Sequence, residues 1–291
     1  MVSAIITTHN RKELLKRAIE SVLSQTFKDM ECIVVDDAST DGTRELCKSY
    51  PIQYIYIPKE ESKGGNYARN LGIKASSGNY CAFLDDDDYW FPEKIEKQVA
   101  LIEEKQCELV YCGRKSEYIY PDSTIYKDIL PDSRLCGDMH KLILLHICCT
   151  TSTILVLRQA LIDVNFFDER LKFWQEYELT IRLAQRQPFY FVHEALCVYR
   201  VNINDKNRLT NKYFEWRKAV KYIHNKHKKL YKNLTLKEII ISKKQEWSDA
   251  EMRCQASHLT LRKAYYSFLM LPFRVRYFFQ ITRYKLLKKY K

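Results

Sequence analysis

Four aspartates in succession follow a short apolar run in this chain. Asp85–Asp88 come directly after Tyr80–Leu84, a run whose length and aromatic content predict a buried strand. Adjacent carboxylates repel one another, which raises their pKa values and costs stability unless a cation or several hydrogen-bond donors lie among them. Hard oxygen ligands at the end of a strand suit Mg²⁺ or Mn²⁺, which usually share their coordination with substrate phosphates. The pattern therefore predicts a divalent-cation site; the alternative is a solvated acidic turn before the next helix.

The first hundred residues alternate between strand and helix patterns. The predicted strands are Val2–Thr8, Met30–Val35, Ile52–Ile57 and Tyr80–Leu84, and the predicted helices are Arg11–Ser24, Asn66–Ala75 and Pro92–Glu104. Connections of this length imply a parallel, doubly wound half-sheet, and ligands of such sheets bind at the carboxyl ends of strands, where Asp85–Asp88 fall. There is no GxGxxG and no GxxxxGK[ST], so the sequence supports neither a dinucleotide fold nor a P-loop.

The next hundred residues are more irregular. Further strands are predicted at Ile147–Leu157, Phe189–Val192 and Leu196–Val201, and a helix is predicted to follow Phe173–Glu178. Ten cysteines show no CxxC pair and no metal-ligand spacing with His, which indicates buried thiols in a reducing compartment. No signal peptide is evident and no apolar run reaches the roughly 18 residues that span a bilayer. We therefore expect a cytoplasmic protein whose membrane contact, if it has any, is at its surface.

The positive charge of the chain is concentrated in its last third. Residues 205–291 hold 23 Lys+Arg and 6 Asp+Glu, a net of +17, whereas residues 1–204 have a net of −5 within the total of +12. Helices are predicted at Lys212–Tyr231 and Leu236–Ser257, and Pro272 is expected to interrupt a third. A basic, aromatic-rich segment suits an anionic membrane surface. The alternatives are packing of the aromatics on the rest of the chain with the charges solvated, or nucleic-acid binding, which no recognised module supports.

Several segments carry a family resemblance. The chain resembles the family 2, GT-A-type glycosyltransferases, inverting enzymes that use nucleotide-sugar donors. The matching segments are Val2–Arg11, Val34–Thr43, Ala68–Ile73, Phe83–Asp88, Phe167–Glu169, Gln175–Leu183 and Val198–Arg200. The resemblance covers residues 1–204 and implies an α/β fold, a GT-A-like doubly wound nucleotide-binding sheet. The basic helical tail at residues 205–291 is predicted from its charge and pattern alone.

Carried over by position, the resemblance implies a nucleotide site. Thr7 and Asp37 are expected to hold the base, Arg69 to lie near the base or the phosphates, and Asp86 to lie near the ribose. Two departures from the commoner family pattern affect the surroundings: Thr7 stands where Pro is usual, and His9 stands where Tyr is frequent.

The resemblance also implies a metal site and a catalytic base. Asp85 and Asp87 are expected to bind Mg²⁺ or Mn²⁺, which would neutralise the charge that develops on the leaving diphosphate. Glu176 falls at the position of the base, although Gln175 replaces the first acid of the usual pair and Asn202 replaces a frequent His. A carboxylate base is worth roughly 10²–10⁴ in rate. The residues expected on the acceptor side are Thr151, Ser152 and Trp174.

Together these features predict an inverting glycosyltransferase. We expect transfer from a nucleotide-diphosphate donor, with UDP favoured, to a hydroxyl of a saccharide. A lipid-linked acceptor at the inner face of a bacterial membrane, in surface polysaccharide synthesis, fits the basic tail and the resemblance. A metal-dependent nucleotidyltransferase is the rival enzyme, but the N-terminus lacks a Gly-rich Lys/Arg loop for a triphosphate. The non-enzyme rival is a basic surface-binding module without catalysis.

Overall fold

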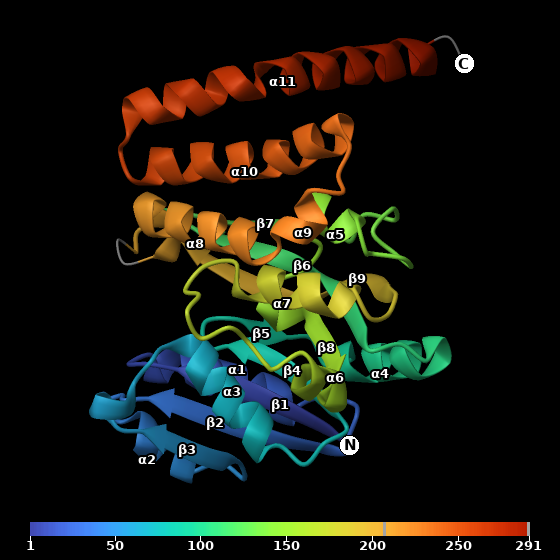
Figure 1. Cartoon of the computed structure of the whole chain (residues 1–291). Helices are drawn as coiled ribbons and strands as arrows, with labels where there is room; N and C mark the ends of the chain where they lie inside the picture. The colour runs from blue at the N-terminus through green and yellow to red at the C-terminus, as the bar shows by residue number, and fades with distance from the viewer. Residues whose placement is uncertain (206–207, 290–291) are drawn as a thin grey trace. The chain divides into compact units, whose positions relative to one another are not determined.

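The structure, a computed structural model, describes residues 1–205 and 208–289. Contacts divide the chain into two compact units, Met1–Asp205 and Lys206–Lys291 (Figure 1). The first unit contains the sheet and the second is helical. The separate functions expected for the sequence on either side of residue 204 stay predictions.

A nine-stranded mixed sheet forms the first unit, in the order β3-β2-β1-β4-β8-β6-β9-β5, with β7 paired to β6. The four strands predicted in the first hundred residues are confirmed to within two residues and pair in parallel, as expected. Beyond β4 the sheet is mixed, because β8 is antiparallel to both β4 and β6. The strand bounds are β1 Val2–Thr8, β2 Met30–Asp37, β3 Gln53–Ile57, β4 Tyr80–Asp85, β5 Tyr89–Trp90, β6 Leu109–Ile119, β7 Thr124–Ile129, β8 Ile154–Leu157 and β9 Phe189–Asn202.

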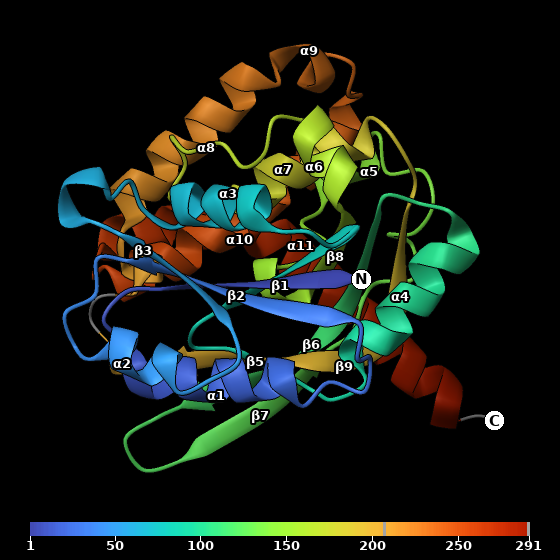
Figure 2. The ribbon, with the colours of Figure 1, turned by 90° about the horizontal axis from the view of Figure 1, so that it is seen from below.

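Helices cover both faces of the parallel half-sheet (Figure 2). α1 and α2 lie on one face, and α3 lies on the other. α3 approaches the sheet closely at Gly72, where an added Cβ would come within 2.5 Å of Ile5 Cγ2. Only glycine fits this approach without a shift of the core. The helix bounds are α1 Lys12–Leu23, α2 Thr43–Lys48, α3 Gly65–Ala75, α4 Lys94–Lys105, α5 Leu142–Leu145, α6 Arg158–Asp163 and α7 Gln175–Ala184.

Two strand predictions in the second half of this unit are wrong. The predicted strand Ile147–Leu157 is reduced to Ile154–Leu157, because a 3₁₀ turn over Thr151–Thr153, in which the Thr153 hydroxyl accepts the backbone N–H of Thr150 at 3.0 Å, bends the chain there. The two predicted strands near residue 190 are one long strand, β9. β9 pairs with β6 throughout, and a register shift between Cys112 and Arg114 absorbs the polar pair His193-Glu194.

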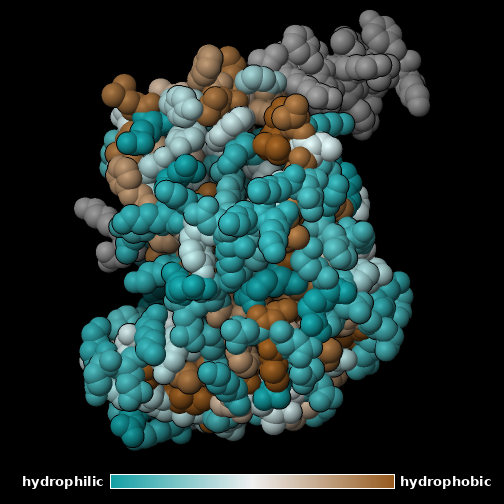
Figure 3. Space-filling view, in the orientation of Figure 1, coloured by the Kyte–Doolittle hydropathy of each residue, from teal (hydrophilic) through white to brown (hydrophobic). Residues whose placement is uncertain are grey.

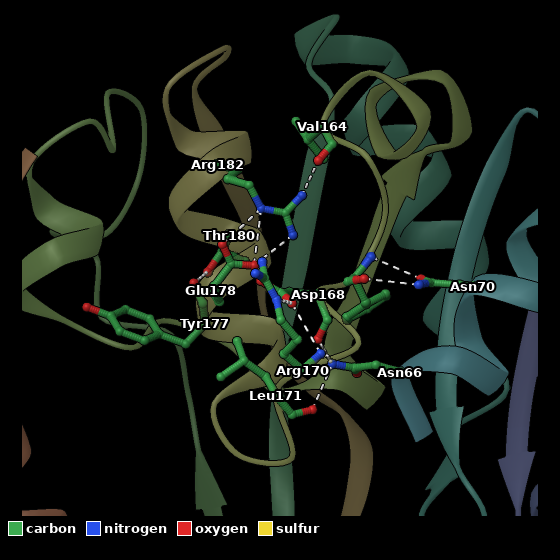
Figure 4. A network of polar contacts seen from close by, with 11 residues as sticks. Asn66, Asn70, Val164, Asp168, Arg170, Leu171, Tyr177, Glu178, Thr180 and Arg182 are labelled. Atoms are coloured by element: carbon green, nitrogen blue, oxygen red, sulfur yellow. Dashed lines mark hydrogen bonds and ion pairs between the residues drawn. The ribbon is translucent and has the colours of Figure 1, made fainter. Parts of the chain in front are cut away.

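A polar network docks the segment before α7 onto α3 (Figure 4). The Asn70 side chain exchanges two hydrogen bonds of 3.0 Å with the backbone of Phe167. Asn66 Nδ2 donates to the carbonyl oxygens of Asp168 and Leu171 at 2.8 and 3.1 Å. These bonds satisfy the backbone of an irregular segment that would otherwise be unpaired. They fix where α7 begins.

Within α7 a buried ion pair joins Glu178 to Arg182 (Figure 4). Arg182 Nη2 donates to Glu178 Oε2 at 2.8 Å and Arg182 Nε donates to Oε1 at 3.0 Å. A third donor of Arg182 bonds the Val164 carbonyl oxygen. The pair therefore links α7 to the end of α6.

We expect the Glu178→Gln substitution to destabilise the protein by about 3 kcal/mol, because it leaves a mostly buried guanidinium without its anionic partner. A thermal melt should show the melting temperature lowered by roughly 5–10 °C. Glu104→Gln is the matched control, since Glu104 forms an exposed ion pair with its neighbour Lys105 and such pairs contribute little. Equal melting temperatures for the two variants would contradict this role of Glu178.

The second unit consists of helices α8 Tyr213–Lys226, α9 Lys228–Tyr231, α10 Leu236–Ala256 and α11 Thr260–Lys289. The predicted helix Lys212–Tyr231 is divided at His227. The expectation that Pro272 interrupts the last helix is wrong, because α11 continues through it; a proline removes one backbone donor without ending a helix that other contacts hold. Among the described residues, none of the helices is both long and apolar enough to cross a bilayer.

Candidate active site

The candidate site lies at the carboxyl ends of β1, β2 and β4. In the sheet register Thr7 is opposite Asp85 on one side, and Thr8 is opposite Asp36 on the other. β1 is the strand from which the chain builds outward first to β2 and β3, and then on the opposite side to β4. This is the switch point at which open α/β sheets bind ligands.

The four aspartates lie at the end of β4, as the sequence predicted, and form a tight turn. Asp85 is the last residue of β4, and the backbone N–H of Asp88 donates to its carbonyl oxygen at 3.0 Å. The Thr8 hydroxyl donates to Asp86 at 2.8 Å. Arg11 Nη1 lies between two carboxylates, 3.0 Å from Asp86 and 3.0 Å from Asp87. Residues of β1 and of the loop after it therefore hold the acidic turn in place.

Asp88 is the innermost member of the turn. Its carboxyl group accepts the Ser152 hydroxyl at 2.6 Å and the backbone N–H of Arg200 at 3.0 Å. The same Ser152 hydroxyl accepts the backbone N–H of Asp85 at 3.2 Å. Ser152 and its neighbour Thr151 are both buried. Ser152 thus supports the acidic turn from inside, and contacts of these two residues with an acceptor stay predictions.

Burial and mutual repulsion shape the electrostatics of the turn. Burial is the main cause that raises the pKa of Asp86 to about 6, with the Asp87 charge adding to it and the Arg11 charge opposing it. Burial and the charge of Asp85 raise the pKa of Asp87. Burial and the charges of Asp87 and Asp85 raise the pKa of Asp88 well above its ordinary value. Full ionisation is therefore unfavourable here unless more positive charge is brought in.

The residues fit a divalent cation. Arg69 donates to one oxygen of Asp85 and Arg11 donates to one oxygen of Asp87; no side chain or backbone N–H of another described residue donates a hydrogen bond to the second oxygen of either carboxylate. The described residues hold no group of three His, Cys, Asp or Glu side chains placed to bind a metal. Mg²⁺ sites that act with nucleotides commonly use one or two carboxylates and complete their coordination with phosphates and water. Asp85 and Asp87 meet that requirement.

Arg69 joins the acidic turn to the start of α7. Its Nη2 lies 2.6 Å from Asp85 Oδ1, and its Nη1 donates to Gln175 Oε1 at 2.9 Å. The Arg69 side chain is buried and also lies over the Phe167 ring, 5.7 Å from its centroid. Gln175 is neutral and stands where the resemblance leads us to expect an acidic residue. Its side-chain oxygen thus accepts a hydrogen bond from Arg69. The contact brings the first turn of α7, with Glu176, beside the carboxylates.

Glu176, the predicted catalytic base, has an environment that raises its pKa. Burial is the main cause that raises its pKa, and the nearby Asp85 charge adds to the effect, whereas Arg69 and Arg114 oppose it. Trp174, just before the helix, has a left-handed backbone with φ of 53° and packs edge-on against Tyr177, at 5.3 Å between ring centroids. A bulky residue in this conformation is strained, and such strain clusters at ligand sites. The predicted base and one predicted acceptor residue therefore share one short segment.

The residues predicted to bind the base of the nucleotide, Asp37 and Thr7, lie at the ends of neighbouring strands. Asp37 closes β2, and its Oδ1 is buried without a hydrogen-bond partner in the part of the chain that the structure describes. His9 Nδ1 bonds the Asp37 carbonyl oxygen and orients this loop. Thr7 is half-buried near the end of β1. An unpaired buried acceptor is costly, so Asp37 is suited to receive an N–H donor from a ligand.

Sequence reasoning did not assign roles to Arg11 or Arg114. Arg11 belongs to a segment that the resemblance includes, but only the fold shows that it bridges Asp86 and Asp87. Arg114 lies at the register shift of β6, stacks 4.7 Å from the Tyr199 ring centroid and has a buried Nε without a hydrogen-bond partner among the described residues. No sequence signal marks a bulge of this kind. The positive charge of Arg114 opposes the rise in the pKa of Glu176.

The raised pKa of Asp86 predicts a pH-dependent stability. Its pKa is higher in the folded chain than in the unfolded chain, so the metal-free protein loses about 3 kcal/mol of stability as pH rises from about 4 through about 6. Asp86→Asn removes this loss while it keeps the side-chain shape. In melts with a chelator, the stability of the variant relative to the native chain should therefore increase with pH and level off above about 6. A difference that is constant from pH 4 to 7 would contradict the assignment.

The sheet order, the acidic turn at the switch point and the helices on both faces define a GT-A-type fold. The family model for glycosyl transferase family 2 matches residues 3–164. The chain belongs to this family.

Relatives and solved structures agree with this placement. An uncharacterized glycosyltransferase of Rickettsia prowazekii is 35% identical over 69% of this chain and 64% of its own length. The chain thus spans slightly less than two thirds of that relative. The Escherichia coli protein named UDP-Glc:alpha-D-GlcNAc-diphosphoundecaprenol beta-1,3-glucosyltransferase WfaP is 40% identical over 43% of this chain and 49% of its own length. The mannosyltransferase PcManGT of Pyrobaculum calidifontis, solved with GDP-Man and Mn²⁺, shares the fold, with a TM-score of 0.62 at 15% identity over 94% of this chain and 82% of its own.

Proposed function

We propose that this chain is an inverting glycosyltransferase that moves a sugar from a nucleoside diphosphate donor, with UDP favoured, to a hydroxyl of a saccharide acceptor. One observation carries the proposal: Arg69 connects Asp85 to Gln175 and so places the acidic turn beside the helix that carries Glu176. One set of carboxylates then serves the leaving group and another carboxylate serves the incoming hydroxyl. Family membership and the name of WfaP support the same reaction class.

On the donor side, the ends of β1 and β2 bind the nucleoside. The buried oxygen of Asp37 accepts an N–H of the base, which uracil offers at its imide nitrogen, and Thr7 lies alongside. Asp86 accepts ribose hydroxyls beside its bond to Thr8. Arg69 contributes positive charge next to the diphosphate. The donor in the name of WfaP is UDP-Glc, which favours uridine over other nucleosides.

Asp85 and Asp87 would hold Mg²⁺ or Mn²⁺ between them and the diphosphate. When bound, the ion neutralises the negative charge that develops as the sugar leaves. Arg11 already holds one oxygen of Asp87 and thereby orients the carboxylate. The Mn²⁺ present in the PcManGT structure is consistent with this choice of ion.

On the acceptor side, Glu176 takes the proton of the attacking hydroxyl. The acceptor oxygen forms a bond to the anomeric carbon while the bond to the diphosphate breaks, and the bonding electrons leave with the nucleoside diphosphate. Attack opposite the leaving group inverts the anomeric centre. Trp174 offers an aromatic surface beside Glu176. Thr151 and Ser152, which are buried, are the other residues that we propose on the acceptor side. The diphosphoundecaprenol-linked sugar in the name of WfaP makes a lipid-linked saccharide the acceptor class that we propose.

Turnover of donor tests this function. The full chain, incubated with Mn²⁺ and UDP-sugars, should release UDP in a metal-dependent reaction, slowly with water and faster with a lipid-linked saccharide. Proton NMR of the transferred sugar should show the anomeric configuration opposite to that of the donor. Pyrophosphate release from UTP and a sugar 1-phosphate would instead establish a nucleotidyltransferase. If neither reaction occurs and no nucleotide binds, the result would favour a basic surface-binding module without catalysis.

A further inference from the structure

The inner side of α11 packs against the other helices of the second unit. The Tyr266 and Tyr213 hydroxyls lie 2.8 Å apart, and the Phe273 and Trp247 ring centroids lie 6.3 Å apart. Met270 is buried, and Arg274 forms an ion pair with Glu251 of α10. Residues 266, 270, 273 and 274 lie on one side of a helix by their spacing. Over the part of α11 whose side chains the structure describes, this side therefore packs against the unit.

The opposite side of α11 is apolar and exposed. Four large side chains form this outer face: Leu261, Tyr265, Phe268 and Leu271, with exposed fractions of 88%, 59%, 71% and 51%. Their spacing of three and four residues places them in one stripe, which contains no charged residue. Figure 3 shows hydrophobic surface over the described part of α11. Contiguous exposure of this kind marks an interaction surface.

The charge of this segment restricts what can cover the outer face. Residues 260–291 contain nine Lys and Arg and no Asp or Glu. A second copy of the chain would bring two such segments together and would be opposed by their repulsion. A nucleic acid would satisfy the charge but would meet the apolar stripe with its polar backbone. An anionic bilayer satisfies both features, because its headgroups attract the cations and its acyl boundary accepts apolar side chains.

We propose that the outer face of α11 binds the surface of an anionic lipid bilayer, with the helix lying in the plane of the interface. Phe268 and Leu261 enter the acyl boundary, and Tyr265 lies at headgroup level. Each Lys or Arg near the headgroups contributes about 1 kcal/mol. This inference stands on the second unit alone and goes beyond the proposed transfer reaction.

Vesicle sedimentation of the full chain tests the proposal. The protein should sediment with vesicles of phosphatidylcholine that contain roughly a third phosphatidylglycerol, and much less with phosphatidylcholine alone. The double substitution Leu261→Glu/Phe268→Glu should weaken vesicle binding at least tenfold. Ile125→Glu/Leu130→Glu is the matched control: it adds the same charge at two exposed apolar residues of the first unit and should bind vesicles far better than the α11 variant.

Three results would overturn the proposal, two of them in the vesicle assay. One is binding to anionic vesicles that the α11 variant retains at the level of the control; the other is no binding of the native chain at all. Loss of a dimer in the α11 variant, seen by sedimentation velocity without vesicles, would assign the face to a second copy instead. Nucleotide titration of the same preparations keeps this test separate from the transfer reaction, because a failure at α11 leaves donor binding intact.

Discussion

The Glu176→Gln substitution should lower kcat by roughly 10²–10⁴ and leave donor binding nearly unchanged. Glutamine keeps the shape of the side chain but cannot take the proton of the acceptor hydroxyl. The nucleotide contacts that we propose come from the strand ends and from Arg69, whose partner in α7 is the neighbouring Gln175. The Kd for UDP with Mn²⁺ should therefore stay within about twofold, because an interaction made only in the transition state has been removed.

The pH profile gives a second readout for Glu176. Because burial and the charge of Asp85 raise its pKa, the rate at saturating donor and metal should fall on the acid side at a pH above the ordinary Glu value of about 4.3. The base works when deprotonated, so the rate rises with pH and then levels off. The Gln variant should lack this acidic limb, and Glu176→Asp should restore part of the rate. Full activity of Glu176→Gln would remove Glu176 from the mechanism.

The Asp87→Ala substitution should abolish metal-dependent donor binding, with a loss of about 100-fold or more in kcat/KM, because the neutralisation of the leaving diphosphate is worth several kcal/mol. The variant should remain folded. Arg11 keeps its ion pair with Asp86. The substitution also removes the Asp87 charge, which helps to raise the pKa of Asp86 and of Asp88. Its melting temperature without metal should equal or exceed that of the native chain.

Asp122→Ala, at an exposed turn between β6 and β7, serves as the matched control for a lost aspartate. It should bind Mn²⁺ and donor as the native chain does. If calorimetry shows that Asp87→Ala still binds UDP with the same gain from Mn²⁺, the ion lies elsewhere and Asp87 is not its ligand. A lower melting temperature of Asp87→Ala would indicate a structural role instead.

Local patterns in the sequence were sufficient for the parallel half of the sheet. Tyr80–Leu84 is apolar on both faces because helices cover both sides of β4. Such a continuous apolar run can be recognised in the sequence as a buried strand. The position of Asp85–Asp88 at the strand end then follows from topology. The resemblance supplied Glu176, and the structure places it beside the acidic turn through Arg69.

Contacts between distant residues could not be predicted in the same way. Arg11 and Asp86 are 75 residues apart, and the bond between Ser152 and Asp88 spans 64. The sequence did not show that the Ser152 hydroxyl donates to the buried Asp88. The sequence also predicted two strands where the structure has the single strand β9, because two polar residues in a bulge resemble a loop between strands. Such features depend on tertiary pairing and leave no periodic signal.

The most direct test of the central claim, a metal-assisted nucleotide site at Asp85–Asp88, is calorimetric titration of the purified full chain with UDP, GDP and CMP, each with and without Mn²⁺. The account predicts binding of UDP that Mn²⁺ strengthens at least tenfold, and weak binding of the other two. Binding of none of the three, or binding of UDP that is indifferent to Mn²⁺, would contradict it.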